Sequence, residues 1–312
     1  MNQVAIIDMG TNTFHLLVAQ WDNYNYQLVC HDWIPTRIGV GSINKNYISP
    51  EAIGRVLDAL RFFKKRADDL RVDKIFAFGT SALRNAVNGP EIVSQIQQTT
   101  GIHTQLISGN EEARLIYEGV NLALNLGSEK SLIVDIGGGS VEFIIGNGKE
   151  IFWKQSFEIG GQRLLEQFQP HDPILSSEIE SLNSHFENSL TPLFEQLKIH
   201  LPVILAGSSG TFDTLSDIYC SQQNIRQKET PETPFDIHSF EKIYHEIISK
   251  NRNERMKING MIELRVDMIV VACCLIKFLI DKFHFEKIRV SSFSLREGVL
   301  ALLMKRTRSI NA

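Results

Sequence analysis

The sequence predicts an α/β protein built from two similar domains that face each other across a cleft. A pattern of apolar strand, polar turn and apolar strand occurs twice, and further strands and amphipathic helices follow each occurrence. The chain of 312 residues is longer than one usual domain, and its apolar content of 43% is sufficient for two hydrophobic cores. We expect a first domain at 1–124, completed by a C-terminal helix at about 298–312, and a second at 125–297.

The first half begins with VAIIDMGTNTFHLLVA, from Val4 to Ala19, which predicts a β-hairpin with Asp8 at its tip. A further strand is expected in YQLVCHDWIPTRIGV, and SPEAIGRVLDALRFFKKRADDL has helical spacing after a Ser-Pro start. KIFAFGTSALRNA then has the pattern of a strand, a turn and a helix, and IHTQLIS that of a short strand. GNEEARLIYEGVNLAL predicts a helix whose acidic first turn suits the helix dipole.

The second half repeats the hairpin in SLIVDIGGGSVEFIIG, with Asp135 in the place of Asp8. It continues with the helix-rich KQSFEIGGQRLLEQF, the strand and turn of PVILAGSSGTFDTL, a long amphipathic region from Phe235, and a last strand and helix in KIRVSSFSLREGVLALLMKR. Between them, the polar, proline-containing segment from Ser221 to Asp236 is the one candidate for a long mobile loop.

Composition excludes several classes of protein. A formal net charge of −4 argues against a broadly basic nucleic-acid surface. The four cysteines have no CxxC spacing, which argues against a zinc site or a disulfide framework. The most apolar run, MIVVACCLIKFLI, contains Lys277 and is too short to span a bilayer. The N-terminus has no signal-peptide pattern, so we expect a cytoplasmic protein with neither a nucleic acid nor a membrane as partner.

The two hairpin turns have the composition of phosphate clamps, because glycines leave backbone N–H groups accessible to anions. The first turn supplies Gly10, Thr11, Asn12 and Thr13, and the second supplies Gly137, Gly138, Gly139 and Ser140. An aspartate beside a phosphate repels it unless a divalent cation lies between them. Asp8 and Asp135 are therefore predicted to be ligands of Mg²⁺ or Mn²⁺, with Glu142 on the following strand as a neighbour of the metal.

Either turn alone is also compatible with an ordinary glycine-containing hairpin that has an acid at its tip. The matched pattern of both turns, each at the start of one half, favours the phosphate interpretation. The sequence contains neither a P-loop motif nor the glycine fingerprint of a dinucleotide-binding fold.

DMGTNT and DIGGGSVE resemble the two phosphate motifs of the actin and sugar-kinase superfamily, whose domains are ribonuclease H-like. TRIGVG, GTSALRNAVN, ISGNEEARLIYEGV, GGQRLLEQF, LAGSSGT, ELRVDMI and SSFSLREGVL follow in an order similar to that of the exopolyphosphatase and guanosine pentaphosphate phosphohydrolase family. The resemblance extends from Val4 to about Leu303 and is to the short, two-domain form. Family members usually carry serine and arginine where this chain has Thr11, Thr13 and His15, which puts the basic contact at position 15 in question.

The resemblance implies a metal-dependent hydrolase that removes the terminal phosphate of inorganic polyphosphate or of guanosine pentaphosphate. It places the catalytic glutamate in GNEEARLIYEG, with Glu112 preferred and Glu111 second. Arg84, after a strand and turn, is a candidate phosphate clamp, and Arg37 is a further polyanion contact. Gly207, Gly210 and Thr211 lie where nucleotide-binding relatives hold adenosine. Arg265, Asp267, Arg296 and Glu297 also match family motifs, but charges at helix starts are more often structural, and we leave them out of the site.

Two other functions stay open from the sequence. A small-molecule kinase of the same superfamily would need an acceptor, whereas a hydrolase releases phosphate with water alone. A non-catalytic sensor of polyphosphate or of a guanosine alarmone would keep the clamps without turnover, although it has no need of Glu112. The choice between the two substrates and the oligomeric state, a homodimer among the alternatives, are not decided by the sequence.

Overall fold

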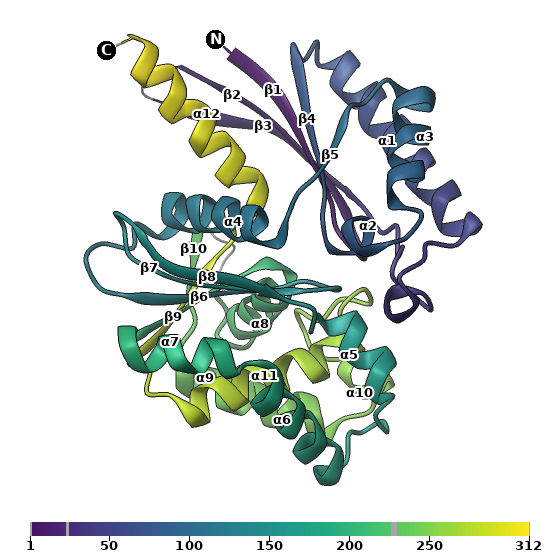
Figure 1. The fold of residues 1–312 in the computed structure, drawn as a ribbon. Helices are drawn as coiled ribbons and strands as arrows, with labels where there is room; N and C mark the ends of the chain where they lie inside the picture. The colour runs from purple at the N-terminus through teal and green to yellow at the C-terminus, as the bar shows by residue number, and fades with distance from the viewer. Residues whose placement is uncertain (1, 23–24, 226–229, 312) are drawn as a thin grey trace. The chain divides into compact units, whose positions relative to one another are not determined.

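The computed structural model describes residues 2–22, 25–225 and 230–311 (Figure 1). Its chain divides into two compact units, Met1–Gly119 together with Leu295–Ala312, and Val120–Ser294. Each unit is built on one mixed β-sheet with helices packed on it. The α/β class and the duplicated plan predicted from the sequence are confirmed.

The sheet of the first unit has the strand order β3-β2-β1-β4-β5. β1–β2 and β2–β3 pair antiparallel, whereas β1–β4 and β4–β5 pair parallel. Its strands are β1 Asn2–Met9, β2 Phe14–Trp21, β3 Tyr26–Ile34, β4 Lys74–Gly79 and β5 Thr104–Leu106. Its helices are the short 3-10 helix Ile43–Lys45, α1 Pro50–Asp69, α2 Ser81–Asn85, α3 Gly89–Thr100, α4 Gly109–Leu124, which runs past the limit of the unit, and α12 Leu295–Asn311.

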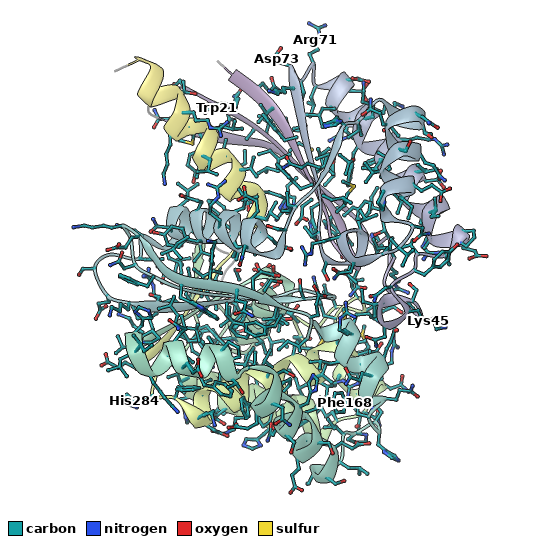
Figure 2. All side chains as sticks on the ribbon, viewed as in Figure 1. Trp21, Lys45, Arg71, Asp73, Phe168 and His284 are labelled. Atoms are coloured by element: carbon teal, nitrogen blue, oxygen red, sulfur yellow. The ribbon has the colours of Figure 1, made fainter. Side chains whose placement is uncertain are left out.

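Helices α1 and α3 lie on one face of this sheet and α12 on the other (Figure 1). α1 begins where the sequence predicts, because the Ser49 side chain accepts a hydrogen bond from the Ala52 N–H and Pro50 occupies the first helical position. Phe14 of β2 and Phe63 of α1 are both fully buried in the core of this unit. Trp21, at the end of β2, donates to the Thr307 hydroxyl of α12 at 3.2 Å and ties that helix to the sheet (Figure 2).

The sheet of the second unit has the strand order β10-β11-β9-β6-β7-β8. Its strands are β6 Ser131–Ile136, β7 Val141–Gly146, β8 Ile151–Phe157, β9 Ile204–Ser208, β10 Glu232–Thr233 and β11 Lys287–Ser291. Its helices are α5 Gly161–Phe168, α6 Ser176–Ser189, α7 Thr191–His200, α8 Ser209–Gln222, α9 Ile237–Ser249, α10 Arg252–Arg255 and α11 Met268–Lys282. β6, β7 and β9 are buried along their whole length.

α11 is the most apolar helix of the chain and is a core helix, as the sequence predicts. In the part of the chain that the structure describes, no helix combines the length and the apolar character that crossing a membrane requires. The long amphipathic region from Phe235 resolves into α9, α10 and α11.

The segment Ser221–Asp236 is not one uninterrupted loop, which corrects the prediction made from its polar composition. Ser221 and Gln222 complete α8, and Glu232–Thr233 forms the short strand β10, which pairs antiparallel with β11. Hydrogen bonds of the ladder and of Ser292, which donates to the Pro231 carbonyl at 2.9 Å, fix this polar stretch against the sheet. Residues 226–229 of the predicted loop lie outside the described residues.

The two hairpins share the same register, which is the structural form of the sequence repeat. In the first, Asp8 lies opposite His15 and Met9 opposite Phe14; in the second, Asp135 lies opposite Glu142. A four-residue turn connects the strands in both hairpins. The first strand of each hairpin also pairs with a parallel strand, β1 with β4 and β6 with β9.

Candidate active site

The first turn is a tight, buried loop in the first unit. The Gly10 N–H donates to the Thr13 carbonyl at 3.2 Å, and a Cβ atom at Gly10 would lie 2.9 Å from that oxygen, so the turn requires glycine. Thr11, Asn12 and Thr13 are almost completely buried, with 4–5% of their surface exposed. Three consecutive buried polar side chains are unusual outside a binding site.

Backbone N–H groups of the TRIGVG segment donate to carbonyl groups of this turn. The Arg37 N–H donates to the Asn12 carbonyl at 2.9 Å, and the Gly39 N–H donates to the Thr11 carbonyl at 3.1 Å. A Cβ atom at Gly39 would collide with the Thr11 methyl group, so the glycine permits this close approach. Arg37 has a φ of 46° and an exposed side chain. Its contribution to the turn is therefore made by its backbone.

The two candidate glutamates at the start of α4 have different surroundings. The Glu112 carboxylate accepts from Arg84 at 2.6 Å, and the side chains of this ion pair are only 10% and 15% exposed. Glu111 instead forms a bidentate pair with Arg114, at 3.0 and 2.7 Å, and both of these side chains are 39% exposed. Hydrogen bonding to Glu111 raises the pKa of Arg114. Glu112 is thus the inward-facing acid of the pair and Glu111 the surface one.

Local sequence explains why α4 presents the two acids in this way. Ser108 caps the helix: its hydroxyl accepts from the Glu111 N–H at 3.2 Å and its carbonyl from the Glu112 N–H at 2.9 Å. Arg84 of α2 also donates to the Ile107 carbonyl at 3.3 Å, just before this cap. The arginine therefore fixes both the start of α4 and the carboxylate of Glu112.

The second turn is held by the start of α5. Its Gly137 N–H donates to the Ser140 carbonyl at 3.0 Å, which repeats the hydrogen bond of the first turn. The turn carbonyls of Gly137 and Gly138 accept from the N–H groups of Gly161 and Gln162, both at 2.9 Å. No residue that the structure describes accepts a hydrogen bond from the N–H groups of Gly138 and Gly139. The turn thus offers N–H donors while its carbonyls are occupied.

Asp135 and Glu142 form a pair of buried acids directly opposite each other on β6 and β7. They are 4% and 1% exposed, and cross-strand partners point to the same face of a sheet. The Ser156 hydroxyl donates to Glu142 at 2.6 Å. Like charges in this position destabilise a sheet, which indicates that a cation or strong donors offset the cost.

Three serine hydroxyls surround the Asp135 carboxylate. Ser208 and Ser294 donate to its Oδ2 atom at 2.7 and 2.6 Å, and Ser209 donates to its Oδ1 atom at 2.6 Å. None of these serines was among the site residues predicted from the sequence, although they lie in the quoted segments LAGSSGT and SSFSLREGVL. Serines in such segments are common turn and cap residues, so composition alone does not single them out.

Arg265 is a further residue that sequence reasoning left out of the site. Its guanidinium lies against Gly210, where any Cβ atom would collide with it. Burial lowers the pKa of Arg265, while the charges of Asp213 and Asp135 act in the opposite direction. Arg265 is partly buried, and its guanidinium places a positive charge near Asp213 and Asp135.

The remaining predicted residues have mainly structural surroundings. A Cβ atom at Gly207 would collide with the Phe212 ring, so this glycine serves core packing. Thr211 is buried in the first turn of α8. Of the family-motif charges, Asp267 pairs with Arg252, and Arg296 contacts His31 in the first unit.

The donor set fits a magnesium site of the kind that shares its cation with a phosphorylated substrate. No group of three or more His, Cys, Asp or Glu residues with metal-binding geometry occurs within residues 2–22, 25–225 and 230–311. Mg²⁺ commonly binds through one or two carboxylates together with substrate phosphates and water. The buried, paired oxygens of Asp135 and Glu142 meet that requirement.

The chain is similar to known proteins over almost its whole length. The model of the Ppx/GppA phosphatase family matches residues 17–307. An exopolyphosphatase from Cytophaga hutchinsonii has 39% sequence identity, 98% of each chain covered and a TM-score of 0.95. A Ppx/GppA family member from Aquifex aeolicus, at 22% identity with 98% of each chain covered and a TM-score of 0.80, has the same two-domain, actin-like fold.

Proposed function

Because the chain belongs to the Ppx/GppA phosphatase family, we propose that it removes the terminal phosphate of inorganic polyphosphate or of guanosine pentaphosphate. The chain is a phosphoanhydride hydrolase. The observation that carries the choice of a phosphoanhydride as substrate is its 39% identity, over 98% of both chains, to an exopolyphosphatase. The actin-like fold alone also supports kinases, so the fold does not carry this choice.

Hydrolysis of a phosphoanhydride requires a group that orients or deprotonates the attacking water. We assign this role to Glu112, because it is the buried acid of its pair and a guanidinium holds its carboxylate. Arg84 has two tasks in this proposal. It fixes the orientation of Glu112, and its planar set of N–H donors suits the oxygens of a phosphate.

The developing charge on the phosphate oxygens requires donors and cations. We propose that the N–H groups and hydroxyls of the two turns supply the donors, each within its own unit, and that Arg265 adds a positive charge in the second unit. Mg²⁺ or Mn²⁺ held by Asp135, with Glu142 beside it, would supply further neutralisation. Asp8 is proposed as a metal ligand on the first hairpin.

We also propose a cellular compartment for the protein. All four cysteines are free, which suits a reducing compartment such as the cytoplasm. Its substrate would be a soluble polyphosphate or nucleotide, with no nucleic acid or membrane as partner.

Phosphate release measured side by side on polyphosphate and guanosine pentaphosphate, with Mg²⁺ and no acceptor, tests the function. We expect release from at least one substrate, and its loss in the Glu112→Gln variant. A kinase would instead require an acceptor, and a sensor would bind substrate without release. Either result would contradict the proposal.

A further inference from the structure

We infer that Ser209 is a positioning residue for Asp135, held in a left-handed backbone conformation so that its hydroxyl fixes the carboxylate oxygen Oδ1. This inference rests on the proposed function in one respect, namely that Asp135 takes part in hydrolysis. It adds a residue that acts through Asp135 and not by touching substrate. The evidence comes entirely from the second unit.

The backbone of Ser209 is strained for a residue that has a side chain. Its φ is +69°, although it opens helix α8, and non-glycine residues rarely adopt this region. Glycine would adopt it without strain. Such strained residues persist where the surrounding structure determines them, and they concentrate at functional sites. This conformation directs the Ser209 hydroxyl to Asp135, to which it donates a hydrogen bond of 2.6 Å.

The preceding residue gives an independent sign of the same arrangement. Ser208 is the N-cap of α8, with extended φ and ψ of −138° and 174°, yet its side chain makes no capping hydrogen bond. A serine at this position ordinarily accepts from a backbone N–H of the first turn. Here its hydroxyl donates to Asp135 Oδ2 at 2.7 Å instead. Two consecutive serines thus donate their hydroxyls to the same carboxylate, that of Asp135.

The three hydroxyls divide unequally between the two oxygens of Asp135. Oδ2 accepts from Ser208 and Ser294, whereas Oδ1 accepts from Ser209 alone among the described residues. A carboxylate has about four acceptor sites, two on each oxygen. Ser209 occupies one acceptor site of Oδ1, and the other stays open to a cation or a bound water. By holding the carboxylate in one orientation, Ser209 sets the direction of that open site. Groups behind a metal ligand typically affect metal affinity or activity by about 10- to 100-fold.

Two variants separate positioning from a structural role because they change the strain in opposite ways. Ser209→Gly removes the hydroxyl and relieves the strain, whereas Ser209→Ala removes the hydroxyl and keeps it. We expect both to lower kcat or to raise the half-saturating Mg²⁺ concentration by about 10- to 100-fold, although Ser209→Gly melts at or above the wild-type temperature. Leu201→Gly is the matched control, because Leu201 also has a positive φ, 48°, but is 71% exposed at the end of α7.

Crystal structures of the Ser209 variants provide a readout that does not depend on activity. We expect the Asp135 carboxylate to rotate or to occupy two orientations in both variants. An unchanged carboxylate, or kinetics within about twofold of wild type in Ser209→Gly while Asp135→Asn is inactive, would overturn the inference alone. If Asp135→Asn itself keeps normal turnover, the proposed role of Asp135 fails, and that of Ser209 fails with it.

Discussion

Replacing Glu112 by glutamine tests the proposed mechanism most directly, because glutamine keeps the shape of the side chain and loses the base. Loss of a positioned general base lowers turnover by about 10² to 10⁴, which corresponds to about 2.7–5.4 kcal/mol in the barrier. Substrate affinity should hold or improve, because a negative charge near the terminal phosphate has been removed. Phosphate release under saturating substrate gives kcat, and the substrate dependence gives KM.

The structure also sets the cost to folding. Glutamine still offers an oxygen to Arg84, but the guanidinium keeps its charge and loses its counter-charge in a largely buried pair. Removing one partner of a buried ion pair costs about 3–5 kcal/mol, which is a large part of a stability of about 5–15 kcal/mol. Turnover is therefore compared per folded molecule, with the folded fraction measured by denaturant titration.

Glu111→Gln is the matched control, because it removes the same charge one residue earlier on the same helix. Its partner Arg114 is at the surface, where such a pair contributes about 0.2–0.5 kcal/mol. We expect nearly normal turnover from this variant. If the kcat of Glu112→Gln lies within about threefold of that of the wild type, the assignment of the base is refuted. If only Glu111→Gln is inactive, Glu111 and not Glu112 is the base.

Three further expectations can be tested with the same protein. Excess chelator should abolish phosphate release and added Mg²⁺ should restore it, and full activity in chelator would exclude a metal role. Gly160→Ala should reduce turnover severely, because its Cβ atom would lie 2.5 Å from the backbone of the second turn. Gly54→Ala is the control, because a Cβ atom there lies in open space on α1; it should leave activity unchanged and add up to about 1 kcal/mol of stability. Burial beside the Phe168 ring lowers the pKa of His185 below its usual 6.5, so the unfolded state takes up the proton first as the pH falls. Unfolding free energy should therefore decrease below about pH 6.5, and by less in His185→Gln, as denaturant titrations at pH 7.5 and 5.5 would measure.

The framework of the site was predictable because it is local in the sequence. Each hairpin is a short stretch whose apolar strands, central acid and glycine turn are adjacent residues, and both turned out to have the same register. The choice between Glu111 and Glu112 was not predictable in this way. Neighbouring positions on a helix point about 100° apart, and only the distant Arg84 identifies which of them faces inward.

The serine shell of Asp135 was not accessible from the sequence because it is made by long-range contacts. Ser208, Ser209 and Ser294 are 73, 74 and 159 residues away from Asp135 along the chain. Parallel pairing of β6 with β9 places Ser208 opposite Asp135, and strand order is a property of the folded sheet. At Gly207 the structure adds a packing reason for the glycine, because a Cβ atom there would collide with the Phe212 ring, and its predicted contact with substrate stays a prediction.

The shared register of the two hairpins also shows where they differ in chemistry. Opposite Asp135 lies a second carboxylate, Glu142, whereas opposite Asp8 lies His15, whose side chain carries no negative charge. The paired acids create a stronger need for a cation than one acid beside an imidazole does. A divalent metal should therefore depend more on the second hairpin: Asp135→Asn should raise the half-saturating Mg²⁺ concentration by more than Asp8→Asn does, when phosphate release is followed as a function of Mg²⁺ at fixed substrate. Equal shifts, or a larger one for Asp8→Asn, would mean that the cross-strand partner does not determine which aspartate binds the metal.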